Sequence, residues 1–84
     1  MFAGELLKVR FKYYGMSVDA VLDRLPTARV LESTEGHQLV EAEVYGKGIV
    51  MWLLSQGKMV EVLKPESLRN EIREQLLDVL KYYE

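Results

Sequence analysis

The feature that most constrains the fold is a repeated change in the spacing of apolar residues along the chain. From Glu5 to Tyr14 apolar and charged residues alternate, which is the period-two pattern of a β-strand with one buried face. Residues 39–45 alternate in the same way. In other segments the apolar residues recur every three or four positions, as they do in an amphipathic helix. A chain that changes period in this way is expected to pack helices against one face of a β-sheet.

These periods, read together with the glycines and prolines that interrupt them, predict seven elements in the order β-α-β-β-α-β-α. The expected strands are residues 5–14, 28–33, 39–45 and 59–63. The expected helices follow Ser17 and stop at Pro26, run over residues 47–56, and open at Pro65. We therefore predict an α+β, ferredoxin-like β-α-β-β-α-β sandwich with an additional C-terminal helix. In that plan the first strand lies between the third and fourth, and the helices cover one face of the sheet.

Length and charge limit the class of protein. The 84 residues, 49% of them hydrophobic, suffice for one small globular domain, and we expect residues 1–84 to form it. A net charge of -2 gives no general attraction to nucleic-acid phosphates, so any such contact would need a local basic patch. Because the chain has no cysteine, no signal peptide and no apolar run of membrane-spanning length, we expect a cytoplasmic protein without membrane contact.

The second half of the chain carries a distinctive run of residues. A tryptophan-bearing helix ends in WLLSQG at residues 52–57, a strand reads VEVLKP at residues 60–65, and a helix opens with ESLR at residues 66–69. This run resembles the C-terminal extension (WCX-type) module of WYL-domain transcriptional regulators. The resemblance extends through the strand at residues 9–11 and the turn at residues 35–36.

The resemblance implies a non-catalytic, ligand-sensing and dimerising module of a transcriptional regulator. In that family the module follows a winged-helix or helix-turn-helix DNA-binding domain and an Sm-like WYL domain, and neither is present in these 84 residues. We therefore expect a fragment of a larger regulator that forms a homodimer and contacts DNA only through upstream domains absent from this chain. The implied effector is a small molecule or a nucleic acid. The alternative is a free-standing protein-interaction or dimerisation domain without effector binding.

A stripe of basic and aromatic residues lies on the outward side of the first strand. We predict that an effector binds to Arg10, Lys12 and Tyr14 on this stripe, since cations beside an aromatic ring suit an anionic ligand. An alternative is that glutamates of the neighbouring strands pair with these cations and leave a solvated, charge-paired face. The glutamates concerned are Glu41, Glu43 and Glu61.

No set of residues in the sequence is suited to catalysis or to metal binding. The loop after the first strand lacks the arginine of acylphosphatase-type chemistry, and the only asparagine, Asn70, lies on the last predicted helix. His37 is the sole histidine, and one imidazole makes neither a catalytic triad nor a metal site. The strand at residues 39–45 also lacks the outward aromatic rings of an RNA-recognition motif. We expect no enzyme activity, no metal and no cofactor.

Four residues are candidates for an interface. The predicted helix at residues 47–56 is apolar on almost every side, and Met51 lies nearly opposite its core stripe, with Trp52 beside it. Tyr82 and Tyr83 end the last predicted helix. We predict that these four residues contact a partner chain. The alternative is that the C-terminal helix folds back and covers this surface within the monomer.

Overall fold

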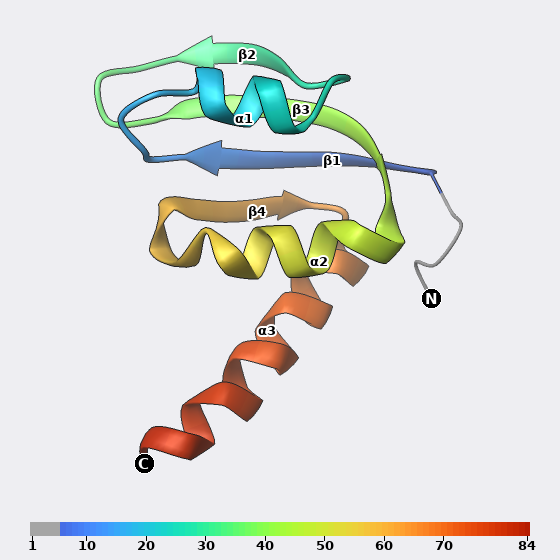
Figure 1. The fold of residues 1–84 in the computed structure, drawn as a ribbon, viewed down its shortest axis with the longest axis vertical. Coiled ribbons are helices and arrows are strands. Elements are labelled where there is room, and N and C mark those ends of the chain that lie inside the picture. The colour runs from blue at the N-terminus through green and yellow to red at the C-terminus, as the bar shows by residue number, and fades with distance from the viewer. Residues whose placement is uncertain (1–5) are drawn as a thin grey trace.

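The computed structural model describes residues 6–84, apart from the side chains of residues 46 and 47. Its strands are β1 (Leu6–Tyr13), β2 (Arg29–Ser33), β3 (Gln38–Tyr45) and β4 (Val60–Lys64). Its helices are α1 (Asp19–Arg24), α2 (Gly46–Ser55) and α3 (Glu66–Leu80), with short 3-10 turns at η1 (Gly57–Met59) and η2 (Lys81–Tyr83). The predicted order of elements is confirmed, while Glu5, the predicted start of the first strand, lies outside the described residues (Figure 1).

The four strands form one antiparallel sheet in the order β2-β3-β1-β4. β1 lies between β3 and β4, as predicted, and pairs with β3 from Leu6 opposite Tyr45 to Tyr13 opposite Gln38. An α+β chain with a four-stranded antiparallel sheet and a C-terminal helix is therefore confirmed. β2 and β4 are the edge strands, and every residue of β2 is exposed.

The core lies between the sheet and the helices, which cover one face of the sheet (Figure 1). Val9 and Phe11 of β1 are fully buried because their side chains point toward the helices, while the charged residues between them point to the other face. The Phe11 ring meets the edge of Trp52 on α2, with 6.0 Å between ring centroids. Helix α1 contributes Val21, and Leu25 directly after it is also buried. The alternation along β1 therefore separates a core face of the sheet from an open face.

Helix α3 begins at Glu66, one residue later than predicted, because Pro65 has an extended backbone and serves as the N-cap residue. Its first turn is anchored by Leu68, whose side chain is fully buried, and Ile72 one turn later is partly buried against the core. Beyond this point α3 leaves the body of the protein (Figure 1). We call residues 76–84 the arm. Since the arm points away from the sheet, the alternative in which this helix folds back over the monomer is wrong.

Candidate functional site

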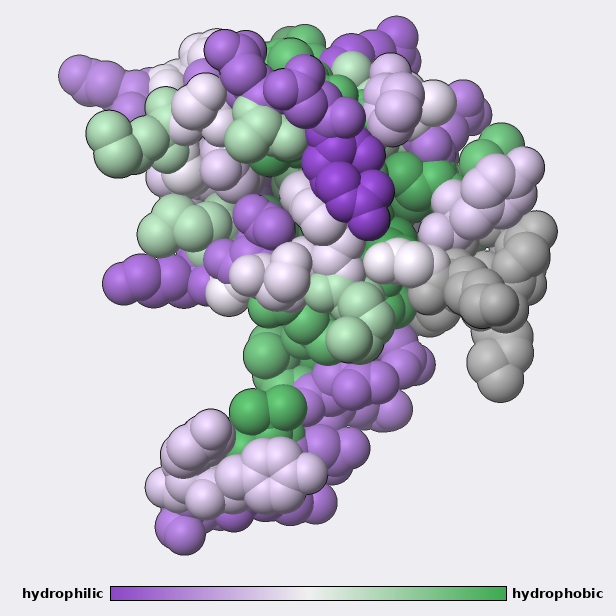
Figure 2. Space-filling model, in the orientation of Figure 1, coloured by the Kyte–Doolittle hydropathy of each residue, from purple (hydrophilic) through white to green (hydrophobic). Residues whose placement is uncertain are grey.

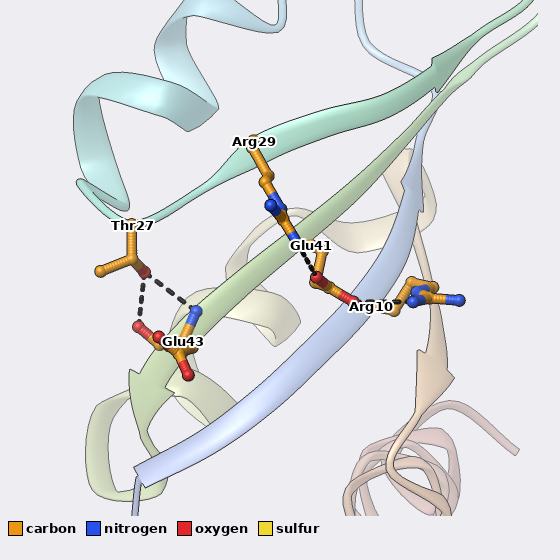
Figure 3. Close-up of polar contacts among 5 residues, drawn as sticks. All are labelled: Arg10, Thr27, Arg29, Glu41 and Glu43. Atoms are coloured by element: carbon orange, nitrogen blue, oxygen red, sulfur yellow. Dashed lines mark hydrogen bonds and ion pairs between the residues drawn. The ribbon is translucent and has the colours of Figure 1, made fainter.

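The open face of the sheet gathers cations from the central strand β1 and the edge strand β2. Lys8, Arg10 and Lys12 project from β1, and Arg29 projects from β2. Backbone register aligns Arg10 with Glu41 of β3 on one side, and Glu41 with Arg29 on the other. Three charged side chains from three strands therefore meet in one row across the sheet (Figure 3).

Glu41 is the centre of this row. Its Oε2 accepts a hydrogen bond from Arg10 Nη2 at 2.7 Å, and its Oε1 accepts one from Arg29 Nη2 at 2.9 Å. The Glu41 side chain is only 7% exposed, so the two guanidinium groups replace most of its water. The hydrogen bond from Arg10, followed by that from Arg29, holds the pKa of Glu41 at about 2, below its ordinary value of 4.5. Glu41 is therefore a permanent carboxylate that orders the two arginines.

This arrangement predicts an acid-sensitive part of the stability. A carboxyl group whose pKa is lowered by folding stabilises the folded state above its unfolded pKa, and that contribution disappears as pH falls from about 4.5 to about 2. We expect Glu41→Gln to lower the urea midpoint at pH 7 and to reduce its further drop between pH 5 and pH 2.5. The control is Glu43→Gln, an exposed glutamate of the same strand, which should keep the wild-type drop. An unchanged pH profile in Glu41→Gln would contradict this role.

The two lysines of β1 are placed differently from Arg10. Lys8 lies opposite Glu43 in the β1–β3 register, and Lys12 lies opposite Glu61 in the β1–β4 register. Neither lysine forms an ion pair within 4.0 Å to any residue that the structure describes. Of the three cations of β1, Arg10 therefore pairs with a glutamate of a neighbouring strand, as the alternative interpretation expected. The charges of Lys8 and Lys12 have no such partner among the described residues and could contact a ligand on the open face.

Tyr14 lies at the end of this face, just after β1. Its hydroxyl donates a hydrogen bond to Glu61 Oε1 at 2.8 Å, and this bond raises the pKa of Tyr14. Its ring lies 5.7 Å from that of His37, which belongs to the β2–β3 turn. The predicted ligand residues Arg10, Lys12 and Tyr14 therefore share one face, but only Lys12 has no charged or hydrogen-bonded partner among the described side chains.

A concave region that the sequence did not reveal lies beside Glu41 on this face. It has a volume of about 230 Å³, and its charged lining includes Lys8, Arg29, Glu41 and Glu43. Thr27 also lines it, and its hydroxyl accepts a hydrogen bond from the Glu43 amide at 2.9 Å and donates one to the Glu43 carbonyl (Figure 3). The sequence places Arg29 near the start of an expected strand, but it does not predict that Arg29 belongs to this site. Its contact with Glu41 depends on how β2 is aligned with β3, which the sequence alone does not determine.

The four predicted interface residues fall into two groups. Met51 is 71% exposed on α2, and Tyr82 and Tyr83 at the tip of the arm are each 81% exposed. Trp52 is only partly exposed, because its ring packs against Phe11. The structure thus leaves Met51 and the two tyrosines accessible, and gives Trp52 mainly a place in the core.

Other kinds of site find little support in residues 6–84. In this range no three histidine, cysteine, aspartate or glutamate side chains gather in a way that could hold a metal ion. Within the same range, no helix combines the length and the apolar composition needed to cross a membrane.

Comparison with protein-family models places the chain in a family. A family model described as the WCX domain matches residues 4–80, which is more than half of the chain and extends through β1 to α3. No curated protein matches the chain.

Proposed function

Because the chain belongs to the WCX domain family, as its resemblance predicted, we propose that it is a non-catalytic ligand-sensing and dimerisation module of a WYL-type transcriptional regulator. The observation that carries the sensing role is the concentration of cations on the open face. Lys8 and Lys12 keep their charges available there, and the Arg29 side chain is 69% exposed although it touches Glu41. An anionic effector suits such a face, since the two lysines and the exposed part of Arg29 can donate charge-assisted hydrogen bonds to it.

The dimerisation role is supported by the arm, which exposes apolar side chains away from the body. An effector changes the output of such a module only if it binds one dimer geometry more tightly than another. We propose that occupation of the open face, including Arg10, Lys12 and Tyr14, shifts the dimer in this way. DNA would be bound by the upstream domains, in the cytoplasm. The fold is proposed to be a ferredoxin-like variant, which the element order and the central position of β1 support.

The sensing role is tested with inorganic phosphate as the probe, at low ionic strength. We expect phosphate to shift the backbone amide signals of residues around Lys8, Lys12 and Arg29 in NMR spectra. Lys12→Ala should weaken the apparent affinity roughly two- to fivefold, because it removes one charge contact with the anion. The matched control is Lys58→Ala, an exposed lysine of η1, which should leave the affinity unchanged.

The same samples test the dimerisation role by light scattering. We expect a mass of about twice the 9.7 kDa of one chain. A monomer across the accessible concentrations would contradict this role, and unmoved amide signals on the open face would contradict sensing of an anion.

The second candidate is a protein-interaction or dimerisation domain without an effector. It is favoured by the exposure of Met51, Tyr82 and Tyr83, none of which needs a ligand to form a contact. A dimeric mass combined with no response to phosphate or to a short single-stranded oligonucleotide would support this candidate over the first.

A further inference from the structure

A hollow lies on the helix side of the sheet, where α1 has ended and α2 begins. Its volume is about 310 Å³, near the lower end of the range of about 300–1,000 Å³ that is typical of small-molecule sites. The hydrophobic side chains that line it come from the segment after α1, from the end of β3 and from α2. They are Leu25, Pro26, Val44, Tyr45, Ile49 and Trp52. A hollow of this size and lining suits a ligand with one ring.

The floor of the hollow belongs to the core. Leu25 and Ile49 are buried, and Val44 and Trp52 are partly buried against the same core cluster. The Trp52 ring is also held by Phe11, which packs against it edge to face. A ligand in the hollow would therefore contact side chains that are already fixed by packing.

One wall of the hollow is fixed by hydrogen bonds. The segment after α1 turns back through a bond from the Ala28 amide to the Leu25 carbonyl at 2.9 Å. Thr27 in this segment is tied to β3, because its hydroxyl bonds both to the amide and to the carbonyl of Glu43. These bonds hold the wall away from α2, so the hollow exists before any ligand binds, as is usual for small-molecule sites.

The rim of the hollow carries one cation whose charge is free. Arg24, in the last turn of α1, is exposed and forms no ion pair within 4.0 Å to any residue that the structure describes. Glu43 also borders the hollow, but it lies opposite Lys8 in the β1–β3 register. Side chains alternate along a strand, so the Glu43 carboxylate belongs to the open face, and its backbone borders the hollow. The rim is therefore suited to an anionic group.

We propose that this hollow binds a small aromatic carboxylate, with its ring against Tyr45 and Trp52 and its carboxylate at Arg24. Aromatic rings pack favourably against one another, and a guanidinium group can donate two parallel hydrogen bonds to a carboxylate. The site goes beyond the proposed function, because it lies on the other side of the sheet from the open face and requires an apolar body in the ligand.

Three probes of the same shape test the ligand class. They are phenylacetate, 2-phenylethanol and phenethylamine, which share a ring and a short chain and differ in charge. Trp52 is the only tryptophan, so its fluorescence reports on the hollow directly. We expect a saturable change with phenylacetate, an affinity about two- to fivefold lower for the alcohol, and the lowest affinity for the amine. No saturable change with phenylacetate, or equal affinity for the amine, would overturn the proposal.

A variant of the rim tests the role of Arg24. Arg24→Met keeps a long side chain and removes the charge, so the affinity for phenylacetate should fall about two- to fivefold while that for 2-phenylethanol stays the same. The matched control is Arg73→Met, an exposed arginine of α3, which should change neither affinity. An unchanged preference for the carboxylate in Arg24→Met would show that Arg24 does not bind it.

A second variant tests the location by filling the hollow. Gly48 lines it from α2, and a Cβ atom added there would meet no atom within 4 Å. Leucine is a good helix former, so Gly48→Leu should fold and should lower the affinity for phenylacetate at least about tenfold. Circular dichroism verifies the fold. Binding of natural strength in this folded variant would overturn the hollow as the site.

A control is needed for apolar surface elsewhere. Figure 2 shows hydrophobic side chains where α3 leaves the body, and an aromatic probe could also contact these. Leu80→Ala, which is in the arm, should leave the response of Trp52 to phenylacetate unchanged. A response that is lost in Leu80→Ala would place the probe on the arm and overturn the proposal.

The two sites can fail separately. Inorganic phosphate has no apolar body and should shift amide signals on the open face without changing the fluorescence of Trp52. A response to phosphate with none to phenylacetate would overturn the hollow as a site and leave sensing on the open face intact. A response to phenylacetate with none to phosphate would support the hollow and contradict sensing of an anion on the open face.

Discussion

Phe11→Ala is expected to leave most of the chain unfolded at room temperature. The Phe11 side chain is fully buried in the centre of β1, and its loss leaves a cavity beneath Trp52. Replacing a buried phenylalanine by alanine costs about 3–5 kcal/mol, which approaches the whole stability of a domain near the lower end of the size range. Urea titration followed by far-ultraviolet circular dichroism measures the effect, independently of any change in Trp52 fluorescence.

The control for this experiment is Leu6→Ala on the same strand. The Leu6 side chain is 58% exposed, so its truncation should change stability by no more than about 0.5 kcal/mol. If Phe11→Ala kept a cooperative transition at the natural urea midpoint, the packing between β1 and α2 described here would be wrong.

Leu68→Ala is expected to be the next most damaging change. Leu68 is fully buried and is the residue that anchors the start of α3, so its truncation should cost about 2–5 kcal/mol. Because α3 then loses its fixed root, the same variant should also lose self-association. Urea titration at low protein concentration reports the stability of the monomer, and light scattering at high concentration reports assembly.

Leu80→Ala on the same helix separates the two effects. Leu80 is half exposed in the arm, so its truncation should leave the monomer's urea midpoint close to the natural value and weaken only the dimer. Equal losses of monomer stability in both variants would show that the arm packs on its own body. For the same reason a deletion that tests the arm should begin after Gln75, since removal of Leu68 unfolds the body as well.

The sequence was sufficient to predict the order and type of the elements because each changes the period of apolar residues. β1 shows this most clearly: Val9 and Phe11 are buried, and the charged residues between them face outward. The central position of β1 also followed, because the expected plan allows few arrangements of four strands. Boundaries were less certain at Pro65, where the backbone geometry of one residue decides where the helix begins.

The candidate site could be predicted only in part. The cations of β1 were visible as a stripe, but the contact of Glu41 with both Arg10 and Arg29 depends on the register of three strands. A shift of one residue in β2 would have turned Arg29 to the other face. The availability of the Lys12 charge likewise depends on Glu61, which accepts a hydrogen bond from Tyr14 and forms no ion pair with Lys12.

The arm shows a different limit of sequence reasoning. The apolar spacing of α3 is the same at Leu68, which is buried, and at Leu76, which is exposed. Periodicity reports that a helix has an apolar side, and it does not distinguish a neighbour in the same chain from one in another chain. Trp52 presents the converse case, since α2 is apolar almost all round and only packing against Phe11 assigns its ring to the core.

The anchoring of α3 at one end has a mechanical consequence. From Leu68 to Leu80 the helix runs without interruption for about 18 Å, at about 1.5 Å of rise per residue, and it is fixed only near its start. A small change in the packing around Leu68 would therefore tilt the whole helix about its first turn. A tilt of about 10° there displaces the far end of that span by about 3 Å, on the same rise per residue. Displacements too small to alter the core can thus become movements large enough to reposition whatever the tip touches.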